Sequence, residues 1–188
     1  MALTALGEQL YAVDPNGDLI LILRDGFKMR VSSKTLSLAS PRLKQLFEGV
    51  SEKTLQDEAE HPEAVRLLVE IYHFKQPSIK DLTVPLLASI ASVCELWGCV
   101  GTIGPYRDLW VISTWKTNHP DNEHQWREWV QIGRVFGRPD IIQEVMKSKL
   151  NGGWKEWTDD ELTLYSYLAG WGDDVVGELF LEIFQNPD

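Results

Sequence analysis

The hydrophobic and polar positions at the start of the chain predict a small β-sheet. Residues 18–23 form an almost continuous apolar run, which is typical of a strand covered on both faces. Asp25-Gly26 follows, a pair that favours a tight hairpin turn. Residues 27–31 then alternate between apolar and basic side chains, as in a strand with one buried face. Residues 10–13 end at a turn and predict a third strand.

Beyond Val31 the apolar residues recur at helical spacing. Ser32 or Ser33 can cap a first short helix, and Ser40-Pro41 can begin a second. Gly98 is expected to end a buried helix within residues 82–100, a stretch whose polar interruptions argue against a membrane span. The remaining apolar stripes predict helices that begin near Pro62, Pro105, Trp126, Asp140, Thr158 and Val176.

The first half also contains an ordered set of motifs. Gly17-Asp18 precedes the apolar strand, the segment VSSKTLSLASP spans residues 31–41, and DEAEHPEA spans residues 57–64. With the apolar helix ending at Trp97-Gly98-Cys99, this set resembles a BTB/POZ domain. Its sequence is most similar to the fungal branch of that family. The resemblance covers residues 9–112. It implies an α+β fold with a small three-stranded sheet flanked by helices, and no active site.

The resemblance also suggests how the chain is divided. In the fungal branch, further helices like residues 129–140 commonly follow the BTB domain, and a polar stretch at residues 116–122 predicts a boundary. We therefore expect four segments. They are a flexible N-terminus (1–8), a BTB/POZ-like domain (9–112), a linker (113–122) and an all-helical extension (123–188).

Self-association is the main activity that the resemblance implies. Dimeric BTB domains pair a buried aspartate with a basic residue beside the first helix. Asp18 matches the aspartate, whereas the basic position falls at Ser33, with Lys34 one residue away. On this resemblance the expected homodimer contacts are Asp18, Lys34 and Leu36, in a non-enzymatic module that also recruits partner proteins.

A more specific alternative is a substrate adaptor for a cullin-based ubiquitin ligase. Family members that bind the cullin scaffold place an apolar-x-Glu motif after the second helix, and Val50-Ser51-Glu52 fits this motif. The resemblance places Val50, Glu52 and Phe74 in the cullin-facing surface.

Composition and charge narrow the classes of partner. The 188 residues are 44% hydrophobic and 24% charged, as in ordinary globular proteins. A net charge of −10 argues against direct binding to a nucleic-acid backbone or to an anionic membrane. Basic residues are concentrated between Arg24 and Lys44. We expect them to fill the outward face of a strand, and the second interpretation is that they contact an acidic protein partner.

Neither the cysteines nor the histidines indicate a metal or a catalytic centre. Cys94 and Cys99 argue against a disulfide framework, and with the absence of a signal-like N-terminus they predict an intracellular location, cytoplasmic or nuclear. Their spacing to His119 and His124 does not match a Cys2His2 zinc site. No Gly-x-Ser-x-Gly motif occurs. We expect no catalytic residue, cofactor or metal.

The eight tryptophans leave one alternative of another class open. Trp126 and Trp129 share the apolar stripe of their helix and are expected in the core. Trp154 and Trp157 flank a Gly-Gly loop, so they are candidates for an exposed protein-contact patch. Alternatively, the helical half forms the pocket of a small enzyme or ligand-binding domain, lined by Trp154, Trp157 and a histidine.

Overall fold

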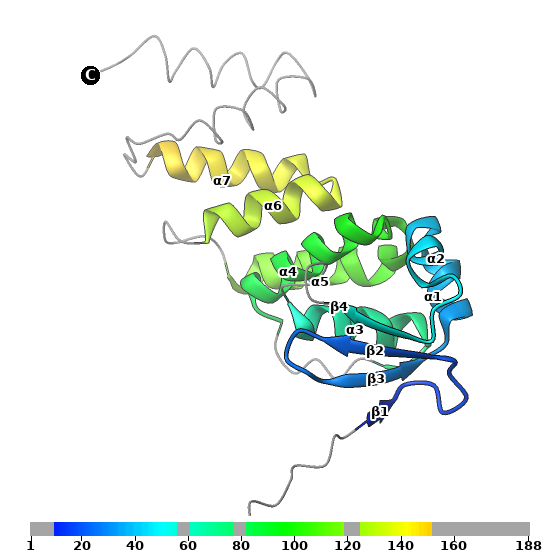
Figure 1. The fold of residues 1–188 in the computed structure, drawn as a ribbon. Helices are drawn as coiled ribbons and strands as arrows, with labels where there is room; N and C mark the ends of the chain where they lie inside the picture. The colour runs from blue at the N-terminus through cyan, green and yellow to red at the C-terminus, as the bar shows by residue number, and fades with distance from the viewer. Residues whose placement is uncertain (1–9, 56–60, 77–81, 119–124, 152–188) are drawn as a thin grey trace, which may run out of the picture. The chain divides into compact units, whose positions relative to one another are not determined.

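The computed structural model describes residues 10–55, 61–76, 82–118 and 125–151 (Figure 1). Within them the chain has an α+β fold, as expected, with a mixed β-sheet and a set of helices. The strands are β1 (Leu10–Ala12), β2 (Leu19–Leu23), β3 (Lys28–Val31) and β4 (Glu52–Leu55). The α-helices are α1 (Ser33–Ala39), α2 (Pro41–Phe47), α3 (Pro62–Tyr72), α4 (Val84–Trp97), α5 (Gly104–Thr117), α6 (Trp126–Phe136) and α7 (Pro139–Asn151), and a 3-10 helix, η1 (Val100–Ile103), precedes α5.

The sheet has four strands in the order β1-β3-β2-β4. The predicted hairpin is confirmed, with β2 and β3 antiparallel and Leu21 opposite Met29. The expected three-stranded sheet is wrong because β4 joins it, parallel to β2, with Glu52 opposite Ile20. Only Leu55 of this strand is buried, so its polar sequence carries no apolar pattern that would have predicted it.

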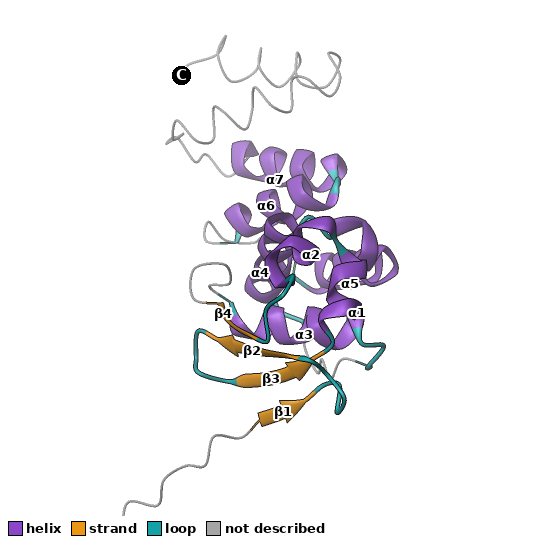
Figure 2. Cartoon of the chain, turned by 45° about the vertical axis from the view of Figure 1, so that its right-hand side comes forward, coloured by secondary structure: helices purple, strands orange, loops and turns teal. Residues whose placement is uncertain are grey.

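The helices lie on one side of the sheet (Figure 2). On β2, Leu19, Leu21 and Leu23 are buried, whereas Ile20 and Ile22 between them are only partly covered. The apolar run therefore belongs to a strand with one fully buried face, not the two that its sequence suggested. Alternating side chains of β3 complete the same core layer.

Serine and glycine residues set the helix ends where the sequence predicted them. Ser32 caps α1 by accepting from the Thr35 N–H, and Ser40 caps α2. Gly98 ends α4 in the left-handed conformation, with φ of 63°. Among the described residues, no helix is both long enough and apolar enough to cross a membrane.

Residues 113–117 of the expected linker belong to helix α5, and residues 119–122 lie outside the described residues. Helix α5 continues to Thr117, because Thr114 is buried and the Trp115 ring packs edge-on against Trp129 of α6 at 4.7 Å between centroids. Helix α6 packs on α4, and Arg134 pairs with Glu95. By contacts the chain separates into residues 1–145 and 146–188 instead, so α6 belongs to the first unit.

Candidate interaction surfaces

The predicted dimer residue Asp18 is exposed and is paired within the chain. Its carboxylate accepts the Ser33 N–H at 2.8 Å and the Ser33 hydroxyl at 2.6 Å. These hydrogen bonds lower the pKa of Asp18 below its ordinary value. Ser33 thus occupies the place that the family resemblance assigned to a basic residue. Lys34 is exposed one position further and forms no ion pair among the described residues.

Leu36, also expected at the dimer surface, is a core residue. Its side chain is 0% exposed, so it cannot contact a partner in this conformation. Two residues further along α1, Leu38 is 80% exposed. At 3.6 residues per turn, a step of two residues rotates a side chain by about 200°, to nearly the opposite side of the helix. The exposed apolar side chain of α1 is therefore Leu38, which the sequence interpretation did not single out.

The end of α3 is tied to β1 and to the start of α1. His73 Nε2 accepts the Ser32 N–H at 2.9 Å, and Lys75 donates to the Ala12 carbonyl at 3.3 Å. The Tyr11 hydroxyl of β1 donates to Glu70 of α3 at 2.9 Å. This network places the last residues of α3 beside the outer strand β1.

Phe74 projects from this network with its side chain 96% exposed. Its φ of 56° is the left-handed conformation, which is uncommon for a bulky residue. Such a backbone costs on the order of 1–2 kcal/mol, so the His73 and Lys75 contacts on either side must hold it. The backbone of Phe74 is thus held by its neighbours, while its ring lies in solvent without support from the core.

The three residues expected to face a cullin are not brought together. Glu52 is exposed at the start of β4, and Val50 lies partly buried just before it. Phe74 follows α3 beside β1, at the opposite edge of the sheet. Three inter-strand steps of about 4.8 Å each separate these edges. Val50 and Glu52 can therefore belong to one surface, while Phe74 belongs with β1 and α1.

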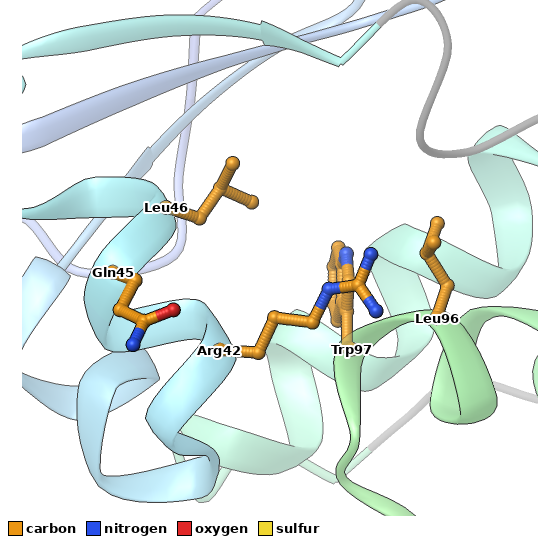
Figure 3. Close-up of a pocket in the computed structure, with 5 residues that line it drawn as sticks. All are labelled: Arg42, Gln45, Leu46, Leu96 and Trp97. Carbon is orange, nitrogen blue, oxygen red and sulfur yellow. The ribbon is translucent and has the colours of Figure 1, made fainter.

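A cavity of about 300 Å³ lies between α2 and α4, and we call it the Trp97 cavity (Figure 3). Its lining residues are Arg42, Gln45 and Leu46 of α2 and Leu96 and Trp97 of α4. Ser40 builds the junction, because its hydroxyl donates to the Trp97 carbonyl oxygen and accepts the Arg42 N–H at 3.0 Å.

Two of the residues that line this cavity carry a donor without a partner among the described residues. The Trp97 side chain is 1% exposed, and its indole N–H forms no hydrogen bond. A buried donor without an acceptor costs about 1–3 kcal/mol. The Arg42 guanidinium, which reaches from α2 toward the Trp97 ring in Figure 3, forms no hydrogen bond or ion pair among the described residues. No sequence pattern links these residues, which are far apart along the chain.

Cys94 and Cys99 form a buried cluster with Tyr72. Both cysteines are free and almost fully inaccessible. The hydrogen bond between the two thiols, followed by burial, raises the pKa of Cys94. Burial also raises the pKa of Tyr72, whose hydroxyl accepts from Thr102 at 3.3 Å. The hydrogen bond between the two thiols lowers the pKa of Cys99. Because Cys94 is 0% and Cys99 1% exposed, a reagent cannot reach either sulfur in this conformation.

Several candidates from the sequence lie outside the described residues. They are the tryptophan pair Trp154 and Trp157 and the histidines His119 and His124. Within the described ranges, no three His, Cys, Asp or Glu side chains lie close enough to hold a metal ion. The Trp97 cavity is lined by residues of the segment 9–112, whereas the ligand-binding alternative expected a pocket in the helical extension.

No protein-family model, curated protein or solved structure matches the chain. Among the described residues, the candidate contact features include the exposed side chains around β1 and α1, the exposed apolar side chains of α5, Glu52 on β4, and the Trp97 cavity.

Proposed function

We propose that this chain is a non-enzymatic protein–protein interaction module of the BTB/POZ type, which acts by self-association and by recruiting a partner. Two things support the proposal. The ordered motifs of the first half resemble that family, and the α+β arrangement, with helices on one side of a small sheet, is compatible with it.

The observation that carries the proposal is a group of exposed apolar side chains on elements that contact one another. Leu10 on β1 is 38% exposed, and Leu38 and Phe74 are almost free of contacts. Helix α1 packs on α3, whose C-terminal end is tied to β1. Burying a large apolar side chain contributes roughly 1.5–3 kcal/mol, so covering this group with a second copy is favourable.

The outer strand offers a second means of association. Strand β1 is the first in the sheet order, and among the described strands its only neighbour is β3. Its free edge presents backbone donors and acceptors that a strand from another chain can pair with. We therefore assign self-association to β1, α1 and the end of α3.

The experiment is the molar mass in solution, measured by light scattering over a wide concentration range. The wild type is expected to form a dimer near twice 21.4 kDa. Leu38→Asp is expected to give a monomer, because it places a charge in the contact. Leu109→Asp is the matched control, since Leu109 is also an exposed helical leucine, 65% exposed, but on α5.

The outcomes separate the proposed surface from others. A wild type that stays monomeric at all concentrations overturns self-association. A dimer that survives Leu38→Asp but is lost in Leu109→Asp places the contact on α5 and contradicts the assigned surface. Circular dichroism of each variant verifies that the fold is retained.

A cullin adaptor is the second candidate, favoured by the exposure of Glu52. This carboxylate forms no hydrogen bond or ion pair among the described residues, and Val50 lies two residues before it. Binding of the purified cullin N-terminal region should be lost in Glu52→Gln and retained in Glu48→Gln, which changes another exposed glutamate at the end of α2. Equal binding by the wild type and Glu52→Gln would reject the motif.

A further inference from the structure

The side of the sheet that faces away from the described helices is apolar at its centre (Figure 2). On β2, Ile20 and Ile22 point to this side, and both are only partly covered. A sheet with one face in water usually alternates apolar with polar side chains. Residues 19–23 do not alternate, so their sequence is typical of a strand that is covered on both faces. Among the described residues, helices cover only one of these faces.

The strand register shows which side chains share this side of the sheet. Residues directly opposite one another on neighbouring strands point to the same face. The register of β3, β2 and β4 aligns two such rows. We call these six side chains the open face: Arg30, Ile20 and Glu52 in one row, and Lys28, Ile22 and Thr54 in the other. The alternate residues Leu21 and Met29 are buried on the helix side.

Opposite charges lie on the two sides of the apolar strand. The cations are on β3, and the carboxylate of Glu52 is on β4. The side chains of Arg30 and Glu52 form no hydrogen bond or ion pair among the described residues, and both are at least partly exposed. The open face is therefore a strip of isoleucines with an unpaired positive charge along one edge and an unpaired negative charge along the other.

This pattern is complementary to itself. We propose that the open face binds the open face of a second copy of this chain. Two sheets that pack face to face lie about 10 Å apart. A two-fold axis that runs along β2, midway between the sheets, places β2 over β2 and β3 of each copy over β4 of the other. Arg30 of each copy then lies opposite Glu52 of the other, with the isoleucines in contact between them.

The charges disfavour the other symmetric arrangement. A two-fold axis across the strands would place β3 of one copy over β3 of the other, so that Lys28 and Arg30 would face the same cations. Like charges opposed across an interface are repulsive, and this repulsion fixes the relative orientation of partners. The arrangement with the axis along β2 is an isologous contact, which closes as a pair and does not continue into a fibre.

The size of the open face predicts a weak contact. The five residues of β2 extend about 17 Å, and three strands cover about 14 Å across. A face of these dimensions is smaller than the surface of about 800 Å² that each partner buries in a standard interface. We therefore expect a dissociation constant on the order of 0.1–1 mM. Below about 10 μM the contact leaves the Leu38→Asp variant monomeric.

This contact goes beyond the proposed function and does not rest on it. Strand β1 is the outermost strand, next to β3. With the axis along β2 it extends past the edge of the second copy, because no strand lies beyond β4 among the described residues. Strand β1, α1 and the end of α3 therefore stay available for the self-association proposed above.

The test is sedimentation equilibrium of the full chain up to about 1 mM, in the Leu38→Asp background that removes the other contact. This parent is expected to change from monomer to dimer as its concentration rises. Arg30→Glu and Glu52→Arg, each added singly, should weaken association by about tenfold or more, because the two-fold axis makes each substitution act twice.

An equimolar mixture of these two single variants should associate at least as tightly as the parent. In the mixed pair every charge of the open face again meets an opposite charge, whereas each variant alone meets like charges. Two matched controls make the same substitutions at exposed residues outside the face, Lys44→Glu on α2 and Glu48→Arg at its end. Each control should keep the dissociation constant within about threefold of the parent.

The other outcomes overturn the proposal. A parent that stays monomeric up to about 1 mM excludes the contact. Association that is unchanged in Arg30→Glu and Glu52→Arg places the contact on another surface. Single variants that associate neither alone nor when mixed contradict the assigned pairing of Arg30 with Glu52, while a variant that had lost its fold could not be rescued by mixing. A wild type without the tighter dimer overturns only the self-association proposed above.

Discussion

The carboxylate of Asp18 holds both the N–H and the hydroxyl of Ser33, at 2.8 and 2.6 Å. Asp18 directly precedes β2 and Ser33 is the first residue of α1, so the pair joins the sheet to the first helix. A negative charge at the start of a helix is also favoured by the helix dipole. The proposed self-association surface is therefore anchored by an intramolecular contact of Asp18.

Asp18→Ala is expected to lower the free energy of unfolding at pH 7 by up to about 1 kcal/mol, a modest loss because the carboxylate is exposed. Ser33 lowers the pKa of Asp18 in the folded state. The contribution is thus complete above the unfolded pKa of about 3.9 and is lost as the pH falls through the folded value. Urea denaturation at pH 7 and near pH 2 measures the free energy of unfolding with the Asp18 carboxyl group ionised and protonated.

Ser33→Ala is the companion variant because it removes the hydroxyl bond and keeps the backbone one. Its loss of stability at pH 7 should be smaller than that of Asp18→Ala. The free energy of unfolding of the double variant should lie within a few tenths of a kcal/mol of that of Asp18→Ala, because both substitutions remove the same interaction. If wild type and Asp18→Ala differed in free energy of unfolding by the same amount at pH 2 as at pH 7, the stabilisation would not depend on the ionised carboxylate of Asp18.

Ser40→Ala is expected to cost about 1–2 kcal/mol, because one hydroxyl caps α2 and satisfies the buried carbonyl of Trp97. Ser37→Ala is the control. The Ser37 hydroxyl donates only to the Ser33 carbonyl within α1, so its loss should change stability by less than about 0.5 kcal/mol. Thermal unfolding compares the two. Equal melting temperatures of both variants would show that Ser40 does not join α2 to α4.

Local signals in the sequence predicted much of the fold. Ser40-Pro41 and Gly98 were assigned correctly because capping depends on backbone geometry within a few residues. Strand β4 was not predicted because its sequence is polar and its formation depends on pairing with β2, some thirty residues earlier. Pairing at that distance leaves no periodic pattern in the strand itself.

The candidate surfaces were less predictable than the fold. The family resemblance pointed to the start of α1, but it named Leu36, which the helix turns into the core, and not Leu38. Arg42 and Trp97 lie 55 positions apart and meet only because Ser40 connects their helices. Such a juxtaposition is a tertiary result, and a single sequence contains no spacing that predicts it.

Gly17→Ala should destabilise the protein by roughly 1–3 kcal/mol. A Cβ at this position would lie 2.4 Å from the Val31 carbonyl oxygen, and backbone atoms cannot move away as a flexible side chain can. Gly101→Ala is the matched control, because nothing lies within 4 Å of a Cβ there and its φ is not positive. Chemical denaturation should show the control within about 0.5 kcal/mol of the wild type. Equal stability of the two variants would contradict the close approach at Gly17.

The thiols of Cys94 and Cys99 are expected to resist a water-soluble disulfide reagent while the protein is folded. The hydrogen bond between the two thiols, together with burial, raises the pKa of Cys94, so its reactive thiolate is scarce. The pKa of Cys99 is lowered by the same bond, but both thiols are almost fully buried and inaccessible to the reagent. Labelling should accelerate by orders of magnitude in denaturing urea, and under native conditions its rate should follow global unfolding. Ser40→Ala, which lowers stability without touching either thiol, should therefore speed native-state labelling in proportion to its loss of unfolding free energy. Rapid labelling of the stable wild type would show that the region around Gly98 opens locally, and that the end of α4 is less firmly held than its contacts indicate.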